Sequence, residues 1–192
     1  MKKHLSLIAR SCIALSMGAG VCAAPAAASN DPYSDVCRLL STTSIERAQG
    51  GSFASSKPTL HDDGNLTTAQ CFYELKPSSR SVSLQLIARR AKDGLDPAQL
   101  WNNKFHGKKS GSDGDEQDVE EGKSKERRKP PERLEGIGDE AFWVDTGRDS
   151  ALYVLFDSKL LRLSLGGDAK QADKRKNAIS LAQEVIKNSK KQ

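Results

Sequence analysis

Residues 136–165, GIGDEAFWVDTGRDSALYVLFDSKLLRLSL, decide the fold. Apolar residues gather in three short segments here, 136–143, 151–156 and 160–165, and in the last of them leucines alternate with polar residues. A period of two predicts strands with one buried face. The short polar turn 157–159 joins the last two segments as a hairpin. This stretch therefore predicts three consecutive strands of an antiparallel sheet.

A second strand pair precedes this stretch. Residues 69–75 are apolar and aromatic, and 81–88 alternate cleanly between apolar and mainly polar positions. The turn 76–79 between them contains proline and serine, which favours an antiparallel hairpin. Residues 52–68 are rich in Ser, Gly, Asp and Thr, and we expect a loop there, with a short strand at its start as the open alternative.

Helix signals surround the strands. We expect a short turn over 36–40 capped by Asp35, and a brief helix opened by the capping box Thr43-Ser44-Ile45-Glu46. Asp96-Pro97 starts a further helix, and Asp168 caps a long final one with an apolar stripe. The stripe comprises Ala172, Ile179, Ala182, Val185 and Ile186. The expected fold is α+β, an antiparallel sheet of about five strands with helices packed on one face, in a single domain over 29–192.

The first 28 residues predict a cleavable export signal. Lys2, Lys3 and Arg10 precede and flank a short apolar region, and alanines at 26–28 suit a signal peptidase that cleaves after Ala28. A lipoprotein signal with Cys22 is the alternative, although Val21 is a poor residue before a lipidated cysteine. We expect a periplasmic or secreted protein without a transmembrane segment.

Removal of this signal changes both the net charge of the chain and the number of its cysteines. Its removal leaves 27 basic against 25 acidic residues, so the mature chain is close to neutral and a strongly cationic nucleic-acid binder is not expected. Cys37 and Cys71 remain as an even pair, and in an oxidising compartment we expect a disulfide between them. Metal binding or a redox pair is the alternative, but their spacing is not C-x-x-C.

Residues 107–133 interrupt the globular pattern. The segment contains one sizeable apolar residue, Val119, with six acidic residues over 113–121 followed by a basic block. Such a polyampholyte buries too little surface to order itself, so we expect a disordered insertion. The basic residues Lys125, Arg127, Arg128 and Lys129 could bind a polyanion, with a solvated linker as the alternative.

Three aromatic residues are candidate contact residues: Trp101, Phe142 and Trp143. On a strand, neighbours point to opposite faces, so only one of Phe142 and Trp143 can face the core. The other is then covered by a helix or exposed as a binding site.

The sequence contains few candidate catalytic residues. His61 precedes two aspartates, which suggests either a solvated turn or a metal site, and His106 ends a helix, where a structural role is favoured. Asp139 and Glu140 are neighbours that point to opposite faces if they lie on a strand, so they cannot flank one bond. Hydrolase and phosphate-loop motifs are absent from the sequence. We therefore expect no catalytic constellation, metal or cofactor.

Two segments carry a family resemblance. Residues 35–43, DVCRLLSTT, with Gly50-Gly51 and the second cysteine in Gln70-Cys71-Phe72-Tyr73, resemble small secreted bacterial domains of unknown function, many of them lipoproteins. Residues 136–143 and the Leu-Tyr-Val and Leu-Arg-Leu-Ser-Leu strands resemble the second half of the same domains, which are distantly similar to the PsbP/LpqN type of α/β sandwich. The resemblance implies no catalytic residues.

The expected function is an exported, non-enzymatic binding module that contacts a protein or envelope partner through its sheet or its charged loop. The alternative is an envelope hydrolase or accessory enzyme that uses His61 and neighbouring acids. Polyanion binding by 123–133 is a third hypothesis, which predicts affinity that falls steeply with salt.

Overall fold

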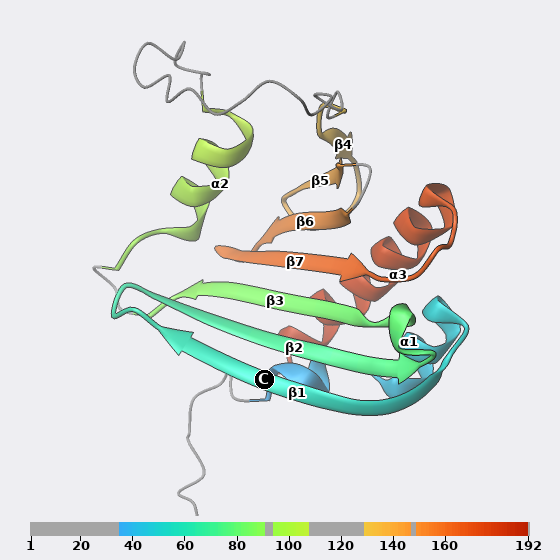
Figure 1. Cartoon of the computed structure of the whole chain (residues 1–192). Helices are drawn as coiled ribbons and strands as arrows, with labels where there is room; N and C mark the ends of the chain where they lie inside the picture. The colour runs from blue at the N-terminus through green and yellow to red at the C-terminus, as the bar shows by residue number, and fades with distance from the viewer. Residues whose placement is uncertain (1–34, 91–93, 108–128, 147–148, 192) are drawn as a thin grey trace, which may run out of the picture.

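The computed structural model describes residues 35–90, 94–107, 129–146 and 149–191. A single antiparallel sheet of seven strands, in the order β1-β2-β3-β7-β6-β5-β4, forms its centre (Figure 1). The strands are β1 (Ser52–Asp62), β2 (Leu66–Lys76), β3 (Val82–Arg89), β4 (Glu132–Leu134), β5 (Glu140–Asp145), β6 (Ser150–Phe156) and β7 (Lys159–Leu165). The fold is thus α+β, as expected, but the expectation of about five strands was wrong.

The two additional strands lie at the edges of the sheet. β1 occupies most of the segment expected to be a loop, and β4 falls in the last part of the expected insertion 107–133. β1 pairs only with β2, and its side chains are largely exposed. Since neither of its faces is buried, hydrophobic alternation is not required there.

Helices cover both faces of the sheet, which corrects the expectation of one covered face. The short 3-10 helix η1 (Val36–Leu39), α1 (Thr42–Gln49) and α3 (Gln171–Ser189) pack on one face, called the inner face here; α3 passes behind the central strands in Figure 1. The helix α2 (Pro97–Phe105) packs on the opposite, outer face, against β3 and β7. A 3-10 turn, η2 (Ser78–Arg80), joins β2 to β3.

The main core lies between the inner face and α3. Alternate residues of the central strands, such as Leu84, Leu152 and Leu163, are fully buried there. From α3 the buried apolar residues are Ala178, Leu181, Ala182 and Val185, whereas Ala172, expected in the same stripe, is exposed. The hydrophobic effect of this layer fixes the helix on the sheet.

Three of the four helix caps expected from the sequence do not form. Ser41 caps α1 by accepting a hydrogen bond from the Ser44 backbone, and Glu46 binds the Phe53 N–H instead of closing a capping box. Neither Asp35 nor Asp168 caps a helix with its side chain, because η1 has no such bond and α3 begins after Lys170. The remaining cap, Asp96 on α2, is confirmed.

A disulfide ties η1 to the sheet. Cys37 and Cys71 are bonded, with a Cα–Cα distance of 5.2 Å, which confirms the expected pair. The Tyr73 hydroxyl, also on β2, donates to the Cys37 carbonyl at 3.2 Å. Burial, followed by the nearby charge of Glu184, raises the pKa of this hydroxyl above its usual value, so it stays a donor.

Candidate functional site

Phe142 and Trp143 lie on opposite faces of β5, and both are buried. Trp143 is 5% exposed in the inner core, and Phe142 is 9% exposed beneath α2 on the outer face. The sequence left two possibilities for the residue that does not face the main core: coverage by a helix, or exposure as a binding site. In the structure, a helix covers it. Trp101 and Phe105, both on α2, cover Phe142, so two of the predicted contact residues, Trp101 and Phe142, pack together.

The outer aromatic cluster consists of Trp101, Phe105, Phe142 and Tyr153. Phe105 stacks on Phe142 with ring centroids 4.5 Å apart, and Trp101 lies 4.4 Å from Phe105. The ammonium of Lys104 lies 4.7 Å from the centre of the Tyr153 ring. These contacts make α2 a packed element, so its aromatic residues stabilise the fold.

Glu140 is the polar anchor of this cluster. Its Oε2 atom accepts hydrogen bonds from Trp101 Nε1 at 2.6 Å and from His106 Nε2 at 2.8 Å, and Arg133 lies 3.6 Å from Oε1. Burial acts to raise the pKa of Glu140, but the bonds from His106 and Trp101 and the charges of His106 and Arg133 outweigh it, so the net shift is downward. Glu140 and His106 thus hold α2 on the sheet, in agreement with a structural role for His106.

This anchor predicts a pH-dependent stability. A carboxyl whose pKa is lowered on folding stabilises the fold above its unfolded pKa, and that contribution is lost as pH falls through the folded pKa. We expect Glu140→Gln to lower the free energy of unfolding by about 1 kcal/mol at about pH 6. The difference from wild type should shrink below about pH 4, as measured by urea denaturation across pH. A difference that is constant with pH would contradict this role of Glu140.

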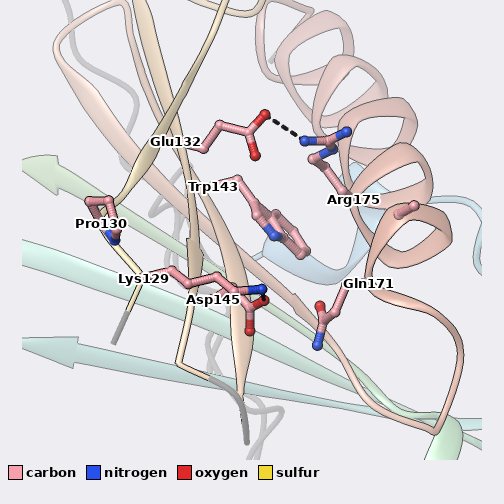
Figure 2. Close-up of a pocket in the computed structure, with 8 residues that line it drawn as sticks. Lys129, Pro130, Glu132, Trp143, Asp145, Gln171 and Arg175 are labelled. Carbon is pink, nitrogen blue, oxygen red and sulfur yellow. Dashed lines mark hydrogen bonds and ion pairs between the residues drawn. The ribbon is translucent and has the colours of Figure 1, made fainter. Parts of the chain in front are cut away.

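A cleft lies on the inner side, between the first turn of α3 and strands β4 and β5. Its volume is about 220 Å³, and Figure 2 shows the indole of Trp143 at its centre. Two of the predicted binding residues, Trp143 and Lys129, are thereby brought together. The cleft is lined by Lys129, Pro130, Glu132, Trp143, Asp145, Gln171, Ala172 and Arg175.

Local sequence explains why a cleft forms at this place. α3 begins at Gln171 without a side-chain cap, and the second residue of the helix is the small Ala172. β4 is only three residues long, so it covers β5 from Glu132 to Leu134 and leaves Asp145 beyond the paired region. The helix start and the short edge strand therefore face each other over the end of β5.

The polar groups of the cleft are arranged in two levels. At the rim, Arg175 donates to Glu132 at 2.5 Å (Figure 2). Deeper, the Asp145 side chain is 13% exposed, and Lys129, which is 77% exposed, reaches to 3.7 Å from it. Within the part of the chain that the structure describes, the Oε1 atom of Gln171 is buried without a hydrogen-bond partner. Such an atom is costly to leave unpaired.

The other predicted residues lie elsewhere. Three of them, Lys125, Arg127 and Arg128, fall outside the described residues, as do the export signal 1–28 and most of the insertion.

The motif around His61 lies at the end of β1. His61 is exposed, and Asp62 pairs with Arg90. Asp63 accepts hydrogen bonds from the backbone N–H groups of Asn65 and Leu66 in the turn that follows. These backbone bonds lower the pKa of Asp63. His61 and Asp62 are the last two residues of β1, and only Asp63 belongs to the turn that follows, so the expected turn begins later than the motif.

The sequence missed four polar residues of the cleft: Glu132, Asp145, Gln171 and Arg175. Arg175 and Gln171 belong to a helix that was expected, but β4 was not, so nothing placed Glu132 beside that helix. Asp145, at the end of the Phe142-Trp143 strand, was the one available signal, because its position two residues after Trp143 puts it on the same face.

A second hollow, of about 340 Å³, lies at the ends of β3, β6 and β7. Among the described residues, Arg162 and Lys174 line it without a carboxylate in ion-pair contact, and Arg162 donates to the Tyr153 hydroxyl at 3.1 Å. Lys174 donates to the Gly167 carbonyl at 2.7 Å. Asp149 also lines this hollow, so the charges around it are mixed.

Comparisons with protein-family models, with curated proteins and with solved structures found no match for the chain. Among the described helices, none has the length and apolar character needed to cross a membrane. The described residues also contain no group of three or more His, Cys, Asp or Glu placed to hold a metal ion.

Proposed function

We propose that the protein is an exported, non-enzymatic binding module of the bacterial envelope, and that the cleft between α3 and β4–β5 is its binding site. The observation that carries the proposal is the cleft itself, where the recessed Asp145 and Gln171, whose buried Oε1 has no hydrogen-bond partner among the described residues, lie beside Trp143. Buried polar groups in a small concave site with an aromatic wall are typical of ligand recognition.

Export is supported by two features of the chain. The basic start, apolar stretch and alanines of residues 1–28 have the form of a signal peptide cleaved after Ala28. The Cys37–Cys71 bond is compatible with an oxidising compartment. The likeness to small secreted bacterial domains agrees with this location, in the periplasm or outside the cell.

The proposal predicts capture of an envelope protein or envelope polymer that depends on the cleft. Arg175→Glu breaks the pair with Glu132 and places two carboxylates together at the rim, so we expect it to reduce capture from periplasmic extract at least tenfold. Lys187→Glu makes the same charge reversal at an exposed position in the last turn of α3 and should leave capture unchanged.

Two outcomes of this experiment would contradict the proposal. Equal loss in both variants would indicate a general effect of positive charge rather than binding at the cleft. Unchanged capture in Arg175→Glu would place the binding surface elsewhere, for example on the outer face. Thermal unfolding of both variants verifies that each is folded.

A further inference from the structure

We propose that the hollow at the ends of β3, β6 and β7 binds the carboxylate group of a small organic acid, with Arg162 as its main donor. The hollow has a volume of about 340 Å³ and shares no lining residue with the cleft between α3 and β4–β5. The inference therefore goes beyond the proposed function and does not depend on it. It follows from an uncovered part of the sheet, from two cations without a carboxylate partner and from accessible hydroxyl donors.

The hollow lies on a part of the outer face that α2 does not cover. The helix packs on Ile87 and Leu160, at the end of β3 and the start of β7 (Figure 1). Ser83 and Ser164, which line the hollow, lie at the other end of these two strands and directly opposite each other. Arg162 precedes Ser164 by two residues, so its side chain leaves the strand on the same face. An arginine thus stands beside a pair of small hydroxyl side chains.

The guanidinium of Arg162 is oriented but not saturated. Its Nε donates to the Tyr153 hydroxyl at 3.1 Å. In the described part of the chain its two terminal nitrogens have no hydrogen-bond partner, and they are not buried. A guanidinium presents parallel N–H groups that match the two oxygens of a carboxylate. The bond to Tyr153 restrains the side chain while its remaining donors stay accessible to a ligand.

Lys174 adds a second positive charge at the hollow. The residue is 9% exposed, and its ammonium donates to the Gly167 carbonyl at 2.7 Å. Among the described residues, no carboxylate lies in ion-pair contact with it. A recessed charge without a counter-charge is screened less than an exposed one, so its field extends into the hollow. Lys174 therefore attracts an anion without having to touch it.

The hydroxyl groups supply further donors. Ser83 Oγ accepts a hydrogen bond from Gln70 Nε2 at 3.3 Å, which leaves the hydroxyl hydrogen of Ser83 available to a ligand. The Ser164 hydroxyl has no hydrogen-bond partner within the described residues and is not buried. Hydrogen bonds from hydroxyls to a carboxylate are charge-assisted and therefore strong. Arg162, Ser83 and Ser164 together can serve both oxygens of one carboxylate.

Asp149 limits the charge of the ligand. It is the one carboxylate among the described residues that line the hollow, it is exposed, and it forms no ion pair with either cation. Two cations and one carboxylate leave a surplus of one positive charge, which a monoanion neutralises. A phosphate dianion would exceed this surplus and be repelled by Asp149. Phe72 is exposed at the border of the hollow and offers an apolar contact to the carbon chain of an organic acid.

A ¹H–¹⁵N NMR titration of the folded, oxidised protein tests this inference with four probes at constant ionic strength: butyrate, butanol, butylamine and inorganic phosphate. The first three share a four-carbon chain and differ in the group at one end. We expect saturable shifts of the Ser83, Arg162 and Ser164 amides with butyrate at millimolar concentration, and weaker binding or none with the other probes. No shift with butyrate, or tighter binding of phosphate or butylamine, would overturn the inference.

Variants locate the binding. Arg162→Gln should weaken butyrate binding about tenfold or more, since it removes the charged donor. Arg162→Lys keeps the charge but loses the paired N–H groups, so a several-fold loss is expected. Arg47→Gln, the same change at an exposed position in the last turn of α1, should have no effect. If the Arg162 variants fail to fold, Ser164→Ala provides the second test, with a several-fold loss. Equal affinity in wild type and in the folded variants of the hollow would overturn the assignment.

Asp149→Asn tests the sign of the ligand charge. Removing a nearby negative charge should strengthen butyrate binding, whereas at a cation site it would remove an attractive charge. Weaker butyrate binding in Asp149→Asn would overturn the inference. Capture from periplasmic extract provides a separate readout: if butyrate does not bind but capture still depends on Arg175, the inference is wrong and the proposed function stands.

Discussion

Replacing both Cys37 and Cys71 by alanine is expected to lower the free energy of unfolding by about 3–4 kcal/mol, as estimated from loop entropy. The bond closes a loop with a sequence separation of 34 between η1 and β2, and its loss allows the unfolded chain many more conformations. Cys71 is fully buried in the main core, so the variant also loses packing there. A domain of this size has only about 5–15 kcal/mol of stability in total.

Urea denaturation of the wild type and the double variant measures this effect. The reduced wild-type protein serves as the control, and it should unfold at nearly the same urea concentration as the variant. A difference of less than about 1 kcal/mol between oxidised and reduced protein would mean that the bond does not restrain the unfolded chain.

Trp101→Ala has the second large expected effect, a loss of about 3–5 kcal/mol in the stability of the outer layer. The residue is almost fully buried, contacts Phe105 and Phe142, and donates a hydrogen bond to Glu140. Because α2 contacts the sheet through few elements, mainly β7 and β3, its loss should free the helix before the main core unfolds. Hydrogen exchange should show the amides of α2 opening while those of β7 remain protected.

Two further variants make this expectation specific. Trp101→Phe retains an aromatic ring but loses the N–H donor to Glu140, so it should cost less than Trp101→Ala. Leu95→Ala changes an exposed residue just before α2 and should have almost no effect. Global unfolding in Trp101→Ala, with β7 exchanging as fast as α2, would show that the outer layer is not a separate unit.

The sheet could be predicted where one of its faces is buried. β3 and β7 are central, and the alternation of Leu84 and Leu163 with polar neighbours reflects that position. β1 could not be predicted, because an exposed edge strand contains Ser, Lys and Pro and lacks an apolar face. β4 is shorter still, and its pairing with β5 depends on contacts far along the sequence.

The sequence contains a signal that both faces of the sheet are covered. Phe142 and Trp143 are adjacent large aromatic residues on one strand, and burial of both requires a layer on each side of the sheet. A covering helix was one of the two possibilities for the aromatic residue that does not face the main core, but no particular helix was assigned to it. The aromatic residues of α2, Trp101 and Phe105, were the complementary signal.

The candidate site was less predictable than the fold. Trp143 and Lys129 were identified as contact residues for separate reasons, an aromatic strand and a basic block. Their meeting in one cleft depends on where α3 begins, and that start was expected after a cap at Asp168 but lies after Lys170. The buried Oε1 of Gln171 has no hydrogen-bond partner among the described residues, and this is a property of packing that has no signature in sequence.

The most direct test of the binding cleft uses the two tryptophans of the chain as internal reporters. In a ¹H–¹⁵N NMR spectrum each indole N–H gives its own signal, Trp143 from the cleft and Trp101 from the outer face. On titration with the partner captured from periplasmic extract, the signal of Trp143 and the amides of Asp145 and Gln171 should shift, while that of Trp101 stays in place. Shifts confined to Trp101 and its neighbours, or no shift at either indole, would contradict the account.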